Sequence, residues 1–260
     1  MGRLKQLAVD VAWTLVPFLV LGVLWEIVAR SGIYPPKLFP SLVTVFDALL
    51  RLTVSGILWV NTQGTLLRLV LGFLLAAVIG VLLGIAMGRY RFVEDVFLPI
   101  VSIGYPIPGL AYAPLFVLWF GLGDLPAVLL VGIASSFSVI INTWKGVKAV
   151  KQIWIRAAES MGATDRQMFY KVILPASLPY IFTGMRLGLA QAWRILVAVE
   201  MLTAVSKGLG WMIFGAQEFL ATDVMLVGIA MIGAIGLLLE KQVFKRLETY
   251  TVVRWGMMTA

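Results

Sequence analysis

Cysteine and histidine are both absent from this chain of 260 residues. Without cysteine the chain forms no disulfide and has no thiol nucleophile; without histidine it lacks the usual zinc ligand and the imidazole that shuttles protons near neutral pH. A phosphate-binding loop of the form G-x-x-x-x-G-K-[ST] is also missing, so the chain by itself cannot bind ATP in the P-loop manner. These absences argue against a thiol enzyme, a zinc enzyme and a self-contained ATPase.

Charged residues are scarce, at 13% of the chain, while hydrophobic residues make up 61%. A soluble domain has roughly a quarter charged residues, so this composition is typical of an integral membrane protein. A membrane-crossing helix needs about 20 apolar residues, and the chain therefore has room for several crossings and little else. We expect an all-α membrane protein in which residues 1–260 form a single transmembrane domain.

Six apolar segments are candidate membrane-spanning helices, at about 12–28, 66–87, 96–120, 125–144, 178–203 and 224–240. With the N-terminus inside, the inner side holds Arg3, Lys5, Arg89, Arg91, Lys145, Lys148, Lys151, Arg156, Arg166, Lys171, Lys241, Lys245, Arg246 and Arg254, and the outer side only Arg30, Lys37, Arg51 and Lys207. Lysine and arginine concentrate in cytoplasmic loops. Both termini are therefore predicted to be cytoplasmic.

Small residues recur every four positions along the second apolar segment. They are Gly72, Ala76, Gly80, Gly84 and Gly88, which share one face of a helix. Such a stripe lets another backbone approach closely, so we predict that it packs against a neighbouring helix.

The loop after the fourth segment has the pattern of two short helices joined by a tight turn. The first helix has an apolar face formed by Ile153, Trp154, Ala157, Ala158 and Met161. Gly162 suits the left-handed conformation that follows a helix. Residues 164–167 have the T-x-x-Q form of a capping box, so a second helix can start there, bury Met168 and Ile173, and stop before Pro175. The pattern predicts a compact hairpin of helices at the cytoplasmic surface.

This hairpin resembles the E-A-A-x3-G-x9-I-x-L-P signature of the inner-membrane permease subunits of ABC importers, which docks into a groove on the ATPase. Arg156 stands where the family has its first Glu, which removes a negative charge, and Val172 stands where it has Ile. The resemblance implies that the ATPase-coupling residues are Arg156, Ala157, Ala158, Glu159, Gly162, Ala163, Leu174 and Pro175.

Other segments resemble the nitrate, sulfonate, taurine and bicarbonate branch of these permeases. They are residues 105–115, 119–123, 184–188 and 200–202. Residues 218–223 are most similar in sequence to taurine permeases. The resemblance covers roughly residues 35 to 245 and implies a fold like that of type I ABC importers. It also implies import of a small, anionic solute. Taurine or another sulfonate is the leading candidate, and nitrate, bicarbonate, aromatic carboxylates and pyrimidine precursors are the alternatives.

Helix-breaking and ionisable residues inside the apolar segments are the candidates for the translocation pathway. Pro106 and Pro108 interrupt the third segment and free backbone carbonyls, so this helix must face protein or a water-filled cavity. Arg194 and Glu200 lie in the fifth segment, on different sides of the helix at 100° per residue. Each could contact the solute or only pack helices. Arg186 lies closer to the start of this segment, where snorkelling to the inner interface is the simpler interpretation.

The resemblance implies an assembly in the bacterial cytoplasmic (inner) membrane. Two copies of the chain would pair, as a homodimer or with a related subunit, and two ATPase subunits would bind the hairpins and hold ATP and magnesium. An extracytoplasmic binding protein would deliver the solute. The chain itself would lie in the lipid bilayer, bind no nucleic acid, hold no cofactor and not be an enzyme.

A self-contained secondary carrier is the main alternative, because such carriers also contain broken helices. We find no convincing internal repeat, and Glu200 is the only acid well inside a segment. A DNA-binding helix-turn-helix uses a similar glycine turn, but apolar segments on both sides tether this hairpin to lipid. An intramembrane enzyme would need a metal site, a nucleophile with a base, or clustered carboxylates, and Ser135, Ser136 and Ser138 have no candidate base nearby in sequence.

Overall fold

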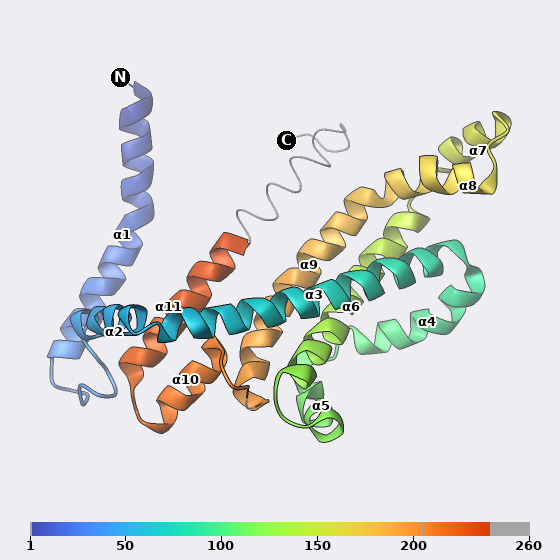
Figure 1. Ribbon diagram of the computed structural model, residues 1–260. Helices are drawn as coiled ribbons and strands as arrows, with labels where there is room; N and C mark the ends of the chain where they lie inside the picture. The colour runs from blue at the N-terminus through green and yellow to red at the C-terminus, as the bar shows by residue number, and fades with distance from the viewer. Residues whose placement is uncertain (1, 204, 240–260) are drawn as a thin grey trace.

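Helices make up the regular structure of residues 2–203 and 205–239, which the computed structural model describes, and no strand occurs among them. In chain order they are α1 (Gly2–Arg30), α2 (Leu42–Val54), α3 (Ile57–Arg89), α4 (Arg91–Gly104), the 3₁₀ turn η1 (Gly109–Tyr112), α5 (Ala113–Phe120), α6 (Asp124–Lys148), α7 (Gln152–Ser160), α8 (Asp165–Met168), the π-helical turn η2 (Phe169–Ile173), α9 (Leu174–Leu202), α10 (Leu209–Glu218) and α11 (Thr222–Leu238) (Figure 1). The prediction of an all-α protein is confirmed.

The centre of the fold is α6, which packs against α3 on one side and α9 on another (Figure 1). The small-residue stripe of α3 makes the first contact. A methyl group added at Gly80 would lie 2.4 Å from Val139 Cβ, and one added at Gly84 would lie 2.6 Å from Thr143 Cβ. Close contacts of this kind repeat from Gly72 to Gly88, so the packing role predicted for the stripe is confirmed.

We expect Gly80→Ala to lower the free energy of unfolding by about 1–3 kcal/mol, because the added methyl group forces α3 and α6 apart. Gly215→Ala in α10 is the matched control, since nothing lies within 4 Å of a Cβ built there. Thermal unfolding of the two purified variants in one detergent measures the difference. Equal midpoints would show that the stripe does not set the spacing between α3 and α6.

The third apolar segment is not the single span that its length predicts. It forms α4 and the pair η1–α5, and the two parts are bent by 96° at the break between them. Pro106 and Pro108 lie in this break and cannot donate backbone hydrogen bonds, so the helix stops at Gly104. Pro99 is accommodated inside α4, and Pro114 lies in the first turn of α5, where a missing donor costs little.

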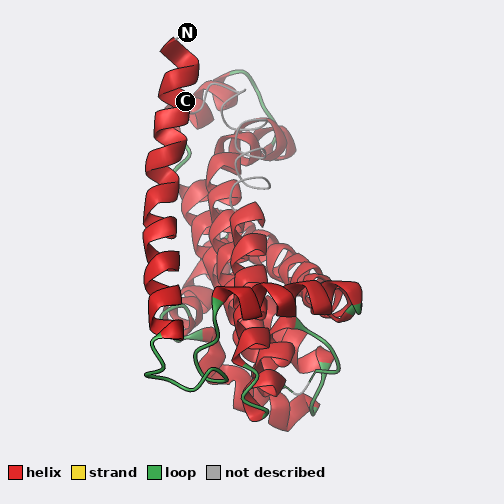
Figure 2. Ribbon diagram, turned by 90° about the vertical axis from the view of Figure 1, so that its left-hand side faces the viewer, coloured by secondary structure: helices red, strands yellow, loops and turns green. Residues whose placement is uncertain are grey.

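Among the described residues, α3, α6 and the continuous helix from Asp165 to Leu202 are each long and apolar enough to cross a membrane. The bent pair of α4 and α5 makes a fourth if it counts as one span, and α11 is a shorter apolar helix. The first predicted segment lies within α1, which stands apart from the central helices in Figure 1 and runs along the left edge of the molecule in Figure 2. Residue 240 and the predicted cytoplasmic group Lys241, Lys245, Arg246 and Arg254 lie outside the described residues.

Candidate functional site

The predicted hairpin is present, and its turn has the geometry expected from the sequence. Gly162 has a φ of 75°. Its N–H donates to Glu159 O at 2.9 Å, and the N–H of Ala163 donates to Ala158 O at 3.0 Å, which together form a Schellman motif at the end of α7. Thr164 and Gln167 then form the predicted capping box that starts α8.

The second helix of the hairpin does not stop before Pro175 as the sequence predicted. It passes from α8 through the π-helical turn η2 directly into α9, so that Asp165 to Leu202 form one continuous helix. Pro175 lacks the N–H that an α-helical bond to Lys171 would need, and the wider turn just before it accommodates this missing donor. The hairpin is consequently a rigid extension of α9.

Helix α7 presents two apolar faces, of which the sequence predicted only one. Ile155 and Ala158 pack on a small core that contains Val147, Val150, Met168 and Ile173. Ile153, Trp154 and Met161 instead lie on the surface, where they are 70%, 49% and 87% exposed. Of the predicted coupling residues, Arg156, Ala157, Glu159 and Gly162 are exposed, whereas Ala158, Ala163, Leu174 and Pro175 are partly buried. The hairpin therefore offers a surface that nothing covers among the described residues.

Polar contacts link the helix ends beside the hairpin, and one of them reaches the hairpin itself. Arg89 at the end of α3 lies 3.7 Å from Asp165, measured between Nη2 and Oδ1. Lys148 at the end of α6 pairs with Glu94 of α4 at 2.5 Å, and Trp144 Nε1 donates to the same carboxylate. The ends of α3 and α6 and the start of α4 thus lie near the hairpin, and the side of the membrane on which these basic residues lie stays a prediction.

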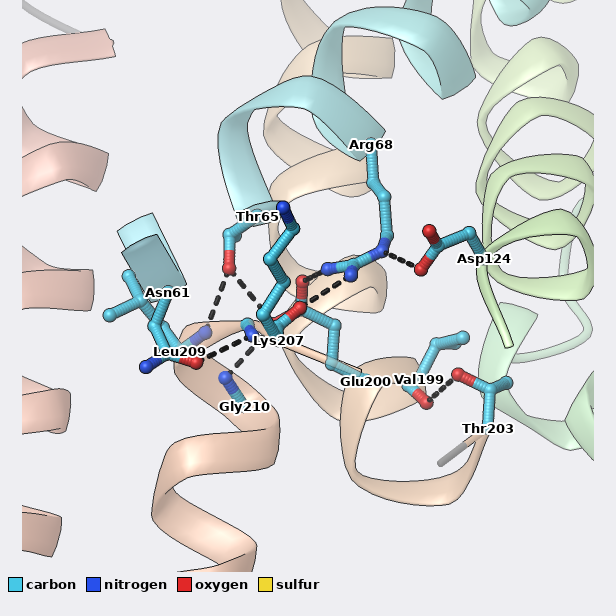
Figure 3. A network of polar contacts seen from close by, with 11 residues as sticks. Asn61, Thr65, Arg68, Asp124, Val199, Glu200, Thr203, Lys207, Leu209 and Gly210 are labelled. Atoms are coloured by element: carbon cyan, nitrogen blue, oxygen red, sulfur yellow. Dashed lines mark hydrogen bonds and ion pairs between the residues drawn. The ribbon is translucent and has the colours of Figure 1, made fainter. Parts of the chain in front are cut away.

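At the other end of α9, Glu200 is completely buried and paired with Arg68 of α3 (Figure 3). Arg68 Nη1 donates to Glu200 Oε1 at 2.5 Å, Nε donates to Asp124 Oδ1 at 2.8 Å, and Nη2 donates to Lys207 O. Thr65 Oγ1 and the N–H of Gly210 both donate to Glu200 Oε2, at 3.0 and 2.9 Å. Each guanidinium nitrogen and each carboxylate oxygen has a partner, as a buried charge pair requires.

Residues 207–210, at the start of α10, surround this carboxylate, and their backbone is part of the same network (Figure 3). The backbone N–H groups at Gly208 and Leu209 donate to Asn61 Oδ1 and Thr65 Oγ1, both at 2.8 Å. A Cβ at Gly208 would lie 2.6 Å from the carboxyl carbon of Glu200, so only glycine fits there without displacement. The network fastens α3, α6, α9 and α10 together at the end of the bundle opposite the hairpin.

A cavity of about 690 Å³ lies between α9 and α11. Arg186, Trp193 and Arg194 line it from α9, and Gly233 and Gly236 line it from α11. The Nε atom of Arg194 donates to Ala190 O, one turn earlier in the same helix. Arg194 thus faces the cavity, whereas Glu200 faces α3, as their different positions around α9 predict.

The model of the family described as "Binding-protein-dependent transport system inner membrane component" matches residues 76–240. The match spans more than half of the chain and includes the hairpin, both ends of α9 and the cavity. The chain belongs to this family. It is a transport permease component of the inner membrane, and the resemblance carried by its hairpin is confirmed.

Two curated relatives are similar to this inner membrane component over most of its length. The taurine transport system permease protein TauC of Escherichia coli (strain K12) is 40% identical over 226 residues, which are 85% of this chain and 82% of TauC. The putative aliphatic sulfonates transport permease protein SsuC of Bacillus subtilis (strain 168) is 33% identical over 241 residues, 93% of this chain and 86% of SsuC. These names support the sulfonate branch that the sequence resembles.

A solved structure of the MetNI methionine ABC transporter, in an inward-facing conformation, contains a chain of similar fold. The TM-score is 0.56 at 18% sequence identity, and the match covers 73% of this component and 95% of that chain. At this identity the likeness concerns the fold alone. It confirms the type I importer fold expected from the sequence.

The predicted pathway residues lie in three different surroundings. Pro106 and Pro108 are exposed at the break between α4 and η1, Arg194 lines the cavity, and Glu200 is enclosed in the network with Arg68. Their roles in a pathway stay predictions.

Sequence reasoning missed Arg68, although a usable signal was present. Arg68 is a charged residue inside a long apolar segment, and Glu200 is an acid in the same situation. Charges at such positions pair with one another, so the two could have been matched as partners.

Proposed function

We propose that this component is the permease subunit of an ATP-driven importer that takes up a small organic anion, with taurine or another sulfonate as the first candidate. The observation that carries the proposal is the uncovered apolar surface of α7, on a hairpin that continues rigidly into α9. The names of TauC and SsuC support the sulfonate class.

In this proposal the hairpin docks into a groove on a separate ATPase subunit, which holds ATP and magnesium. Two copies of the permease pair, each with its own ATPase, and a binding protein delivers the solute from outside. Both termini and the hairpin lie in the cytoplasm, as the distribution of lysine and arginine favours. Ile153, Trp154 and Met161 would supply the apolar contacts of this docking, and the coupling residues around Gly162 would shape it.

ATP can act on the permease only by changing the relative free energies of its inward-facing and outward-facing states. Closure of the two ATPases would move the hairpins, and the continuous helix from Asp165 to Leu202 would transmit this movement. The Arg68–Glu200 network would fasten the far end of that helix to α3 and α6. Movement of one end of α9 then alters the space beside α11, where Arg194 lies.

The proposal predicts that Met161→Asp releases the ATPase. A desolvated aspartate in an apolar contact costs several kcal/mol, so we expect the amount of ATPase that copurifies with the tagged permease to fall at least about tenfold. Phe219→Asp is the matched control, because Phe219 is 82% exposed and lies near α10, away from the hairpin. Quantitative mass spectrometry of the complex in mild detergent gives the ratio. Equal loss in both variants, or in neither, would contradict docking at α7.

A secondary carrier is distinguished by its source of energy. Taurine uptake into cells should stop when ATP is depleted while ion gradients are held, and should need the ATPase subunit. Uptake that survives ATP depletion but stops when the gradients collapse would favour the carrier instead.

A further inference from the structure

Arg68 and Arg194 both lie within long apolar helices, but their guanidinium groups are partnered differently. Arg68 is hydrogen-bonded through all three nitrogen atoms, two of which contact carboxylates. Within residues 2–203 and 205–239, Arg194 forms no ion pair. In the same part of the chain its guanidinium makes one hydrogen bond, from Nε to Ala190 O at 3.1 Å. Its two terminal nitrogen atoms are therefore available to an anion in the cavity.

The cavity has the size and composition of a site for a small organic anion. Its volume of about 690 Å³ lies within the ~300–1,000 Å³ that is usual for small-molecule pockets. Trp193, Leu187 and Ile232 supply apolar walls. An ionisable side chain within a membrane span is stabilised by water or a partner charge, and a guanidinium binds oxyanions in particular.

The two arginines lie on one side of α9, with Ala190 halfway between them. Steps of four residues advance about 6 Å along a helix and turn it by about 40°. Arg186 is thus about 12 Å from Arg194 along the helix axis, in the direction of the hairpin. Both side chains line the same cavity.

We propose that the cavity between α9 and α11 binds the transported solute by its oxyanion, with Arg194 as the principal contact. The ligand class is a small organic anion with a sulfonate or similar oxyanion head group on a short, partly apolar body. This proposal rests on the proposed function, because only an importer would make the bound ligand the transported solute. The phosphate of a membrane lipid offers the same oxyanion chemistry, and a labelling experiment separates the two sources.

The experiment exploits the absence of cysteine from the chain. Ala190→Cys places a single thiol between the two arginines, in the lining of the cavity. The full-length permease, reconstituted in vesicles of phosphatidylcholine, is labelled with 2-sulfonatoethyl methanethiosulfonate and, separately, with the trimethylammonioethyl reagent of opposite charge. We expect Arg194→Gln to lower the ratio of the anionic to the cationic labelling rate about tenfold, because the cavity loses a positive charge. Taking the ratio cancels any change in the reactivity of the thiol itself.

Three controls accompany this measurement. Arg194→Lys keeps the charge and should keep most of the ratio. Ser160→Cys, exposed on the hairpin and outside the cavity, should give a ratio that Arg194→Gln does not change. Taurine should slow the labelling of Ala190→Cys when Arg194 is present and have little effect in Arg194→Gln.

A ratio at Ala190→Cys that does not depend on Arg194 would overturn the proposal, as would a thiol that neither reagent reaches. Vesicles that contain phosphatidylglycerol form the second arm. If anionic lipid abolishes the preference for the sulfonate reagent and taurine gives no protection, the site belongs to a lipid head group and the solute assignment is wrong. Because labelling needs neither the ATPase nor transport, failure of the proposed importer function would appear separately, in the copurification and uptake experiments.

Discussion

We expect Arg68→Leu to lower the free energy of unfolding by about 3–5 kcal/mol, because a buried charge that loses its partner is strongly destabilising. The substitution leaves the carboxylate of Glu200 buried without its positive partner, and it also removes donors from Asp124 and Lys207 O. Thermal unfolding of the purified permease in detergent, followed by circular dichroism, should show a midpoint lowered by roughly ten degrees.

Two further variants separate loss of the buried pair from loss of an arginine in general. Arg51 pairs with Asp223 at 3.1 Å, but its side chain is 65% exposed, so Arg51→Leu should cost at most about 1 kcal/mol. The double variant Arg68→Met with Glu200→Gln removes both charges and should recover most of the lost stability. If Arg68→Leu were no worse than Arg51→Leu, the network would not hold α3 to α9.

The parts of the fold that sequence predicted well are those that depend on neighbours in the chain. The turn at Gly162 and the capping box at Thr164 each need only a few adjacent residues, and both formed as expected. The spacing of Gly80 and Gly84 likewise places them on one helix face wherever that helix lies, although their partners on α6 became known only from the structure.

The features that sequence could not provide depend on contacts between distant segments. Glu200 and Arg68 are 132 residues apart, and periodicity within one helix does not say which acid meets which base. Pro175 reads as a stop signal, yet packing of Met168 and Ile173 on the core beside α6 favours a helix that continues through a π-helical turn. The exposure of one apolar face of α7 could likewise not be predicted, because an apolar sequence pattern does not distinguish a face that packs in a core from a docking surface.

The hairpin and the buried network lie at opposite ends of one helix, which explains how a surface contact could act at a distance. Fastening α9 through Glu200 limits its movement at that end, while the hairpin end packs on the small core that contains Met168 and Ile173 and makes an exposed ion pair between Arg89 and Asp165. The cavity with Arg194 lies between these ends. A force on the hairpin is therefore expected to change the cavity more than the network.

If the proposed function holds, we expect Gly162→Pro to abolish ATP-driven taurine uptake, to about one hundredth or less of the original rate, while the chain still inserts into the membrane. Proline is fixed near a φ of −65° and has no N–H, whereas Gly162 has a φ of 75° and donates to Glu159 O. A conflict of about 3 kcal/mol or more would destroy the turn that orients α7 on α9. Uptake of labelled taurine into proteoliposomes that contain the complete transporter provides the measurement.

Gly32→Pro is the matched control, because Gly32 also has a φ of 75° but lies in the loop between α1 and α2, away from the hairpin. It imposes the same backbone conflict, so a general loss of folding would affect both variants equally. If the hairpin couples ATP hydrolysis to movement of α9, Gly162→Pro should lose transport far more completely than Gly32→Pro. Undiminished uptake by Gly162→Pro, at normal levels of inserted protein, would show that the hairpin is not the lever.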